Sequence, residues 1–203
     1  MTTLAGLQYD GYYLRRFSLG EHSATHINGP ISFHSNGISI DEYSAQSLVV
    51  PAVVIDICKQ AAANPDYLLT VADILAWEAE FGTISAENVL LLYTGSQTKW
   101  LDKNGFLNQD AGRNMQIPGF GNDATQFLTT ERQIAQVGID TDGVDSGQDN
   151  NLTTNRLVLA KQPIVLENLT NLEQLPPQGT TISFPSWSLV FSGCGVVLVL
   201  PLR

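Results

Sequence analysis

Apolar residues in this chain gather in short runs separated by amphipathic segments. Two runs, residues 49–57 and 88–93, are apolar at consecutive positions and rich in Val, Ile and Leu, which is typical of strands buried on both faces. Shorter extended segments are predicted from the same kind of pattern. They cover residues 12–19, 22–34, 137–140, 164–166 and 195–200.

Helices are predicted between these strands. Residues 70–81 have apolar positions at helical spacing and begin with the capping-box pair Thr70 and Asp73. A second helix is predicted over residues 122–136, and a helical turn over 155–160.

Strands and helices alternate along the whole chain, and no repeat, linker or block of charge divides it. This order predicts one α/β domain over residues 1–203. Residues 96–121 show no periodicity and are predicted to form a long loop that covers a binding site. Trp100 in this loop is a candidate for substrate binding.

Composition narrows the classes of partner. The chain has 20 acidic and 10 basic residues, for a net charge of −10, which disfavours binding to nucleic acid or to an anionic membrane. No apolar run is long enough to span a bilayer, and we see no signal peptide. We therefore expect a cytoplasmic protein that binds neither nucleic acid nor a membrane.

Cys58 and Cys194 are the two cysteines, and neither belongs to a C-x-x-C pair. A cysteine-based zinc site is therefore excluded. The spacing leaves a disulfide between them open, but two separate thiols are the simpler interpretation.

The three histidines all lie within residues 22–34. Residues of equal parity share one face of a strand, so His22, His26 and Asn28 are predicted to project together. Two imidazoles and a further ligand are a set that zinc or manganese binds. The spacing alone favours polar strand histidines that bind no metal.

Acidic residues gather between positions 140 and 149, interleaved with glycines. Such clusters are typical of calcium loops, but the closing bidentate glutamate is missing, which favours a solvated acidic turn. The cluster consists of Asp140, Asp142, Asp145 and Asp149. Farther on, Glu167 follows a predicted strand, where a carboxylate either serves a site or caps the next turn. No G-x-S-x-G elbow or phosphate-binding glycine loop is present.

Residues 22–32 read H-S-A-T-H-I-N-G-P-I-S, and further short motifs follow at regular places along the chain. These motifs are the apolar run 51–56, Trp77-Glu78, Thr94-Gly95, Pro118-Gly119, residues 138–141, residues 167–172 and Leu175-Pro176. In this order they resemble the cyclase family, which includes bacterial kynurenine formamidase and isatin hydrolase. The first motif of that family is H-x-G-T-H-x-D-x-P-x-H. The resemblance runs from about residue 12 to the C-terminus and implies a mixed β-sheet flanked by helices.

The resemblance also implies a metal site, in which some residues differ from the metal ligands of the family. His22, His26 and Glu167 match metal ligands of the family, whereas Asn28 replaces its aspartate and Asn155 replaces a later histidine. Because an amide cannot supply the charge that holds two cations together, we expect one zinc or manganese ion, or none. The segment before residue 12 is shorter than in the family.

The catalytic histidine of the family is replaced by Ser32. His34 has the same strand parity, so we expect it to act as the base in place of Ser32, and His34→Ala to abolish activity. The candidate catalytic residues are His22, His26, His34 and Glu167. The candidate substrate-binding residues are Asn28, Ser32, Asn155 and Trp100.

The resemblance implies an enzyme that hydrolyses or cyclises an amide, ester or lactone. The changed ligands disfavour an ordinary kynurenine formamidase. The alternative is a relative that binds a small molecule without catalysis, as the loss of site residues would allow. Because family members are usually homo-oligomers, a dimer or tetramer is expected.

Overall fold

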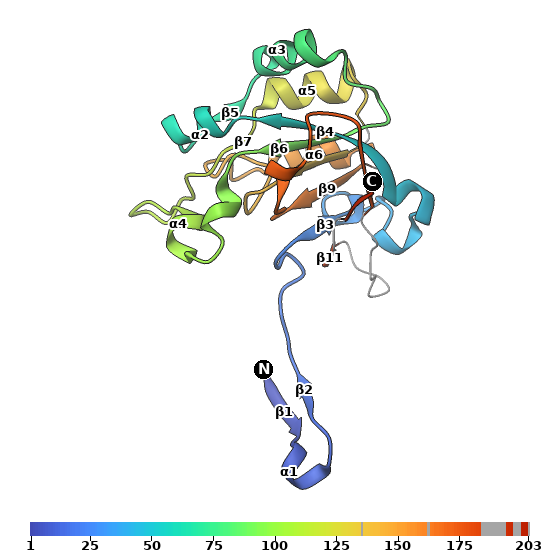
Figure 1. Ribbon diagram of the computed structural model, residues 1–203, viewed down its shortest axis with the longest axis vertical. Helices are drawn as coiled ribbons and strands as arrows, with labels where there is room; N and C mark the ends of the chain where they lie inside the picture. The colour runs from blue at the N-terminus through green and yellow to red at the C-terminus, as the bar shows by residue number, and fades with distance from the viewer. Residues whose placement is uncertain (135, 162, 184–193, 197–199, 203) are drawn as a thin grey trace.

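A mixed sheet forms the centre of the computed structural model, which describes residues 1–134, 136–161, 163–183, 194–196 and 200–202 (Figure 1). Within these residues the sheet has eight strands in the order β11-β3-β9-β8-β6-β4-β10-β12. The strands are β3 (His26–Asn28), β4 (Val49–Asp56), β6 (Val89–Tyr93), β8 (Gln136–Ile139), β9 (Ile164–Glu167), β10 (Thr180–Ser183), β11 (Cys194–Val196) and β12 (Leu200–Leu202). The inner strands β4, β6, β8 and β9 are parallel, and the outer ones pair antiparallel. The predicted α/β fold with a mixed sheet is confirmed.

Two of the inner strands, β4 and β6, come from the apolar runs of the sequence. Leu90, Leu91 and Leu92 of β6 have no exposed surface, as expected for a strand buried on both faces. One strand is predicted over 195–200, whereas the structure has parts of two strands there. β11 ends at Val196 and β12 begins at Leu200, and the intervening positions lie outside the described residues.

The helices are α1 (Leu7–Asp10), α2 (Cys58–Ala63), α3 (Val71–Phe81), α4 (Lys103–Leu107), α5 (Asn122–Thr130) and α6 (Thr153–Leu159). Of these, α3, α5 and α6 pack on one face of the sheet (Figure 1). Trp77 of α3 packs into the core cluster and donates from Nε1 to the carbonyl of Val54 at 2.9 Å. The predicted helix over 122–136 is too long at its C-terminal end. Gln133 has φ of 50°, so the backbone leaves the helical path before it enters β8.

Five 3-10 turns occur among the described residues, and three of them contribute to the other face of the sheet. The turns are η1 (Pro30–Ser32), η2 (Ile40–Glu42), η3 (Ala45–Leu48), η4 (Ser96–Lys99) and η5 (Leu172–Gln174). Ile40, Leu48 and Leu172 from three of them join a second core cluster with the strands. The segment 35–47, polar in sequence, is therefore anchored by its few apolar side chains.

The long segment 96–121 also contains structure. It holds η4, α4 and the short strand β7 (Gly119–Phe120), which pairs with β5 (Leu68–Leu69). Trp100 packs edge-on against Phe106 with ring centroids 5.2 Å apart, although half of its surface is exposed.

An N-terminal arm stands away from the body in Figure 1. It consists of β1 (Thr2–Ala5), α1 and β2 (Leu14–Arg16), with the two strands antiparallel. The strand predicted over 12–19 is reduced to β2. Large apolar side chains of this region are exposed: Leu4, Leu7, Tyr9, Tyr12, Tyr13, Leu14, Phe17 and Leu19.

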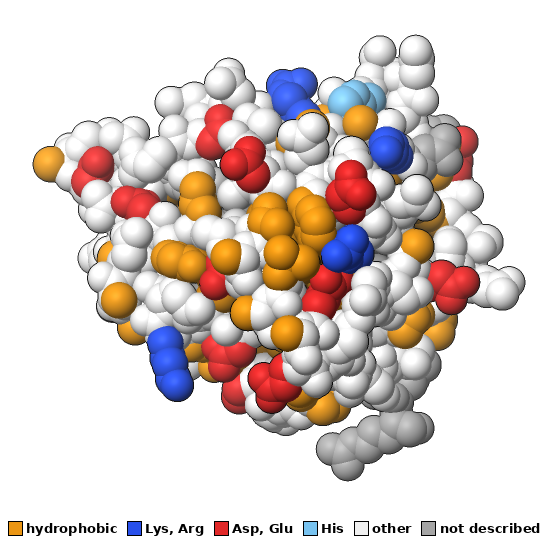
Figure 2. Space-filling view, turned by 90° about the horizontal axis from the view of Figure 1, so that it is seen from above, with side chains coloured by type: hydrophobic (Ala, Val, Ile, Leu, Met, Phe, Trp, Pro, Cys, Tyr) orange, Lys and Arg blue, Asp and Glu red, His pale blue; other side chains and the backbone are white. Residues whose placement is uncertain are grey.

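The surface reflects the excess of acidic over basic residues in the sequence. Viewed from above the helices, acidic side chains are spread over the face and basic ones are fewer (Figure 2). No described helix has the length and apolar character needed to cross a bilayer.

The predicted capping box at the start of α3 is confirmed, and its contribution can be measured. Thr70 Oγ1 accepts from the Asp73 amide at 3.2 Å, and Asp73 Oδ2 accepts from the Thr70 amide at 2.9 Å. Thr70→Ala is expected to lower the free energy of unfolding by about 1 kcal/mol, measured by chemical denaturation. Thr3→Ala, on the exposed arm, is the control. Equal stability of the two variants would contradict a stabilising cap.

Candidate functional site

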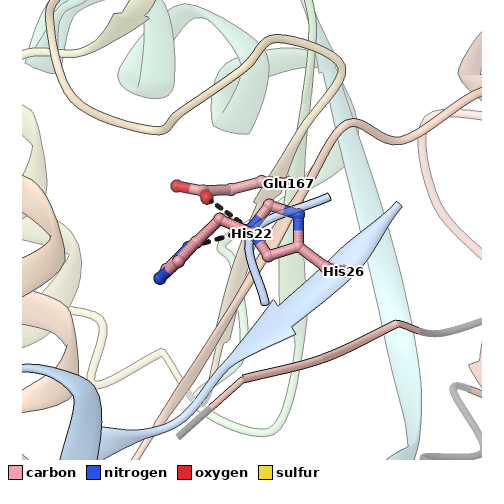
Figure 3. Close-up of side chains that lie close together, drawn as sticks. All are labelled: His22, His26 and Glu167. Carbon is pink, nitrogen blue, oxygen red and sulfur yellow. Dashed lines mark hydrogen bonds and ion pairs between the residues drawn. The ribbon is translucent and has the colours of Figure 1, made fainter. Parts of the chain in front are cut away.

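Two histidines and a glutamate converge at one end of the sheet (Figure 3). His26 Nε2 lies 3.2 Å from His22 Nδ1 and 3.0 Å from Glu167 Oε2. One ligand atom from each of these side chains lies within 4.8 Å of the others. His26 and Glu167 are buried, whereas His22 is exposed.

Strand pairing places His26 beside Glu167. β3 runs antiparallel to β9, and His26 is the register partner of Glu167. Thr25 Oγ1 donates to the carbonyl of Asn168 at 2.7 Å, which fixes the strand entry. The prediction that His22 lies in the same strand is wrong, because β3 begins only at His26 and Ala24 has φ of 57°. The turn at Ala24 nevertheless brings His22 against His26.

The orientation of His26 follows from its partners. Its Nδ1 lies 2.9 Å from the carbonyl of Ala24, which can only accept, so Nδ1 carries a proton and Nε2 faces Glu167. Burial lowers the pKa of His26, but the hydrogen bond and charge of Glu167 outweigh burial and raise it overall. Burial acts to raise the pKa of Glu167, but the contacts with His26, Val144 and Asn28 lower it overall.

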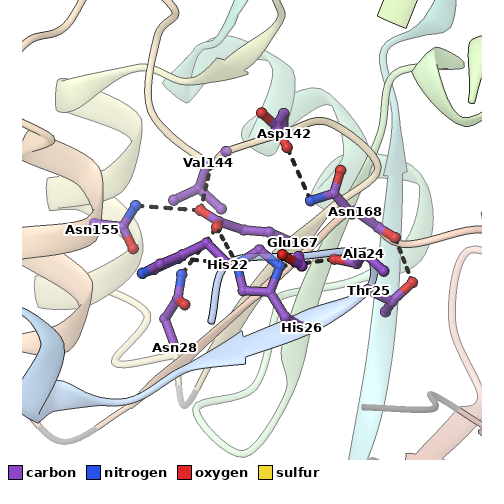
Figure 4. A network of polar contacts seen from close by, with 12 residues as sticks. His22, Ala24, Thr25, His26, Asn28, Asp142, Val144, Asn155, Glu167 and Asn168 are labelled. Atoms are coloured by element: carbon purple, nitrogen blue, oxygen red, sulfur yellow. Dashed lines mark hydrogen bonds and ion pairs between the residues drawn. The ribbon is translucent and has the colours of Figure 1, made fainter. Parts of the chain in front are cut away.

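Two buried amides hold the Glu167 carboxylate (Figure 4). Asn28 Nδ2 donates to Oε2 at 3.0 Å, and Asn155 Nδ2 lies 3.4 Å from Oε1. The Val144 amide also donates to Oε1, at 3.2 Å. The Oδ1 atoms of Asn28 and Asn155 are buried and have no hydrogen-bond partner in the described part of the chain. Each is therefore a buried oxygen whose acceptor capacity is unused.

A cleft of about 480 Å³ opens onto this cluster. Predicted site residues on its wall are His22, His26, Asn28, Asn155 and Glu167. Phe33, Met115 and Ile117 provide an apolar side, and Asp142, Asp145 and Asp149 provide a polar one. An apolar wall beside a few converging polar groups is the usual composition of a small-molecule site.

The structure does not bring His34, Ser32 or Trp100 to this cleft. His34 Nε2 lies 3.0 Å from the carbonyl of Arg156 and lines a separate depression with Pro30 and Leu159. Ser32 is exposed in η1. The shared strand parity is lost after Asn28, because Pro30 begins a 3-10 turn.

Other residues of the cleft had no clear signal in the sequence. Met115 and Ile117 lie in the segment 96–121, which shows no periodicity, and Phe33 follows a 3-10 turn that the predicted strand did not include. Asp142 was visible only as one of several equivalent carboxylates, and its place depends on the fold of the loop that follows β8.

The cluster fits a single divalent cation. Glu167 Oε2 and His22 Nδ1 both face His26 Nε2, and without a cation a proton must separate these electron-rich atoms. Two imidazoles and one carboxylate form a common ligand set for zinc, iron and manganese. His26 Nδ1 bound to a carbonyl is also the usual outer contact of a metal-binding histidine.

Comparison with known proteins places this chain in a family. Residues 2–146 match the model of the Cyclase family, described as "Putative cyclase". The chain belongs to the cyclase family. It is 34% identical to the isatin hydrolase of Roseibium aggregatum over 173 residues, which is 81% of this chain and 65% of that protein. The chain therefore spans just under two thirds of the length of this curated cyclase-family relative.

Solved structures agree with the family. Isatin hydrolase A from Labrenzia aggregata, bound to benzyl benzoate, superposes with a TM-score of 0.91 and 30% identity, over 98% of this chain and 80% of that one. An isatin hydrolase bound to the product analogue thioisatinate gives 0.90 and 30%, over 100% and 80%. The predicted resemblance to the cyclase family is confirmed.

Proposed function

We propose that this chain is a hydrolase whose reaction takes place in the cleft beside His22, His26 and Glu167. Its substrate is a small cyclic carbonyl compound, an amide, ester or lactone, whose ring the enzyme opens by adding water. The observation that carries this proposal is the convergence of these three side chains on a cleft, in a chain 34% identical to an isatin hydrolase. Isatin is a cyclic amide fused to an aromatic ring. Phe33, Met115 and Ile117 give the cleft an apolar wall suited to such a ring.

His22, His26 and Glu167 would hold one zinc or manganese ion. Such an ion supplies Lewis-acid polarisation of the substrate carbonyl. Asn28 donates to Glu167 and adds no negative charge, which supports a mononuclear site. Asn155 and the Val144 amide keep the Glu167 carboxylate in place, so the site is positioned before substrate arrives.

A turnover assay tests this proposal. Purified protein loaded with Mn²⁺ or Zn²⁺ is mixed with isatin, an aryl-fused lactone and a linear aryl amide, and the products are analysed by mass spectrometry. We expect a ring-opened carboxylate that contains one added water, and no such product with His26→Ala. Absence of hydrolysis for every substrate would overturn the proposal. Binding of isatin without turnover, measured by calorimetry, would then favour the non-catalytic alternative.

The variant His34→Ala tests whether a histidine outside the cleft contributes to activity. Because His34 contacts the Arg156 carbonyl outside the cleft, its loss is expected to leave kcat/KM within about threefold of wild type. Steady-state kinetics on the hydrolysed substrate measure this ratio. A loss of activity comparable to that of His26→Ala would contradict the placement and restore His34 as a candidate base.

We also propose that the protein forms a dimer or tetramer through its N-terminal arm. Tyr9 and Phe17 are 88% and 71% exposed, and apolar side chains of this size are usually covered. Light scattering after gel filtration is expected to give two or four times the chain mass, and Tyr9→Glu with Phe17→Glu is expected to reduce it. A monomeric wild type would contradict this assembly.

A cytoplasmic location remains our prediction. Cys58 carries a free thiol, which suits a reducing compartment, whereas the side chain of Cys194 lies outside the described residues. Cell fractionation tests the location.

A further inference from the structure

We propose that Asp142 is a catalytic residue of this site, the carboxylate that accepts a proton from the attacking water. This inference rests on the proposed hydrolysis and adds a base to it. Asp142 is exposed and lines the same cleft as His22, His26 and Glu167, and its side chain points toward Asn168 in Figure 4.

The structure distinguishes Asp142 from the other carboxylates of its loop. Asp140 accepts from the amides of Thr94 and Gln97, and Asp145 accepts from the Thr154 amide and from Asn155 Nδ2. In each of these residues both carboxylate oxygens stabilise the backbone or a buried side chain.

Asp149 is occupied in the same way. Its two oxygens accept from the amides of Asn151 and Thr153 at 2.8 and 2.9 Å. The three carboxylates therefore have structural roles, and the loop is not organised as a calcium loop around a common centre.

Asp142 has one anchored oxygen and one open oxygen. Asn168 Nδ2 donates to Oδ1 at 3.2 Å, and within the described residues Oδ2 has no hydrogen-bond partner. Asn168 is itself fixed, because its amide donates to the Thr141 carbonyl at 2.9 Å and its carbonyl accepts from Thr25 Oγ1 at 2.7 Å. A carboxylate held at one oxygen by a rigid neighbour is suited to orient a water with the other.

The surroundings of Asp142 raise its pKa in the metal-free protein. Desolvation of the carboxyl group raises the pKa, with a further rise from the charge of Glu167, while Asn168, His26 and His22 act to lower it. Asp145 and Asp149 line the same cleft and are the other acidic groups near it. The overall direction is upward, so in the metal-free protein Asp142 holds a proton more readily than an ordinary exposed aspartate.

Other groups in the described part of the chain are less able to take this proton. Ser32 and His34 lie away from the cleft. Glu167 is buried and already accepts from several donors, and His26 has both ring nitrogens engaged.

The chemical step balances with Asp142 as base. The water oxygen bonds to the carbonyl carbon while one of its protons moves to Asp142 Oδ2. When the carbon–nitrogen bond of the cyclic amide breaks, this proton passes to the leaving nitrogen. The products are an amine and a carboxylic acid, which loses its proton to solvent.

Asp142→Asn tests this role, with Asp123→Asn at an exposed position of α5 as the matched change of charge. We expect kcat to fall by about 10²- to 10⁴-fold, because the amide cannot accept the proton. We expect KM, bound metal per chain and the melting temperature to stay near wild type, because Asp142 is not one of the converging ligands. The fall of wild-type activity on the acid side, which reports deprotonation of the base, is expected to disappear from the pH profile of the residual activity. In Asp142→Ala, added formate is expected to restore part of kcat.

The outcomes separate this inference from the proposed function. A wild type that hydrolyses no substrate would overturn both. If the wild type is active and Asp142→Asn has the same kcat, the role of Asp142 is overturned and the proposed function stands. Loss of metal in Asp142→Asn in parallel with loss of kcat would also overturn it, because Asp142 would then act as a ligand.

Discussion

Replacement of Glu167 by glutamine is expected to lower kcat/KM by about a thousandfold or more, and to remove bound metal. The carboxylate accepts from His26, Asn28, Asn155 and the Val144 amide. Glutamine keeps the shape but loses the negative charge, and one of its ends presents an NH₂ group to neighbours that also donate. Steady-state kinetics and elemental analysis of the purified variant measure the two effects.

The matched control is Glu80→Gln, which removes one charge from the exposed surface of α3. It is expected to keep the activity and metal content of wild type. If Glu167→Gln binds metal as wild type does and retains turnover, Glu167 is neither a metal ligand nor necessary for hydrolysis.

Replacement of Asn28 by aspartate is expected to act in opposite directions on the metal-free and metal-bound protein. In the metal-free protein, the bond from Asn28 Nδ2 to Glu167 Oε2 is replaced by two facing carboxylates. We expect a loss of about 3 kcal/mol in the free energy of unfolding near neutral pH. With metal present, the added carboxylate is a further ligand, and we expect affinity to rise about tenfold or more.

The pH dependence of Asn28→Asp has a definite sign. Repulsion by Glu167 raises the pKa of the new carboxyl group in the folded state above its unfolded value. The variant is therefore close to wild type at a pH below the unfolded carboxyl pKa, and loses stability as pH rises through the folded pKa. Denaturation of the metal-free protein at about pH 3 and pH 7 measures this difference, and the measurement at pH 7 is repeated with Mn²⁺.

Asn36→Asp, which adds the same charge at an exposed position, serves as the control for Asn28→Asp. It is expected to change neither stability nor metal affinity appreciably. Equal metal-free stability of the two variants at neutral pH would show that Asn28 does not face the Glu167 carboxylate.

Much of the fold could be predicted from sequence because the inner elements are locally unambiguous. β4 and β6 are continuous apolar runs, and α3 has both an apolar face and a capping box. The sheet order could not be predicted from these patterns alone, because strand pairing depends on contacts between distant residues. The short strands β1 and β2 of the arm are exposed and carry no buried face from which to recognise them.

The site could be predicted only in part. His26, Asn28, Asn155 and Glu167 meet in the cleft, as the motifs of the cyclase family implied. His34 does not, because strand parity was extended through Pro30, where the backbone turns.

The role proposed for Asp142 could not be predicted from the sequence. Four aspartates of one loop are equivalent in sequence, and only the fold decides which of them are used by backbone amides. The open oxygen of Asp142 is a result of tertiary contacts with Asn168, and no local pattern reports it.

The most direct test of the proposed site is the metal content of wild-type protein after loading with Mn²⁺ or Zn²⁺ and removal of free ions. We predict about one ion per chain at His22, His26 and Glu167, with hydrolysis of isatin or a related cyclic compound that depends on this ion. Glu167→Gln is the paired sample and is expected to retain almost none. Less than about 0.2 ion per wild-type chain under these conditions would contradict a metal-dependent hydrolase.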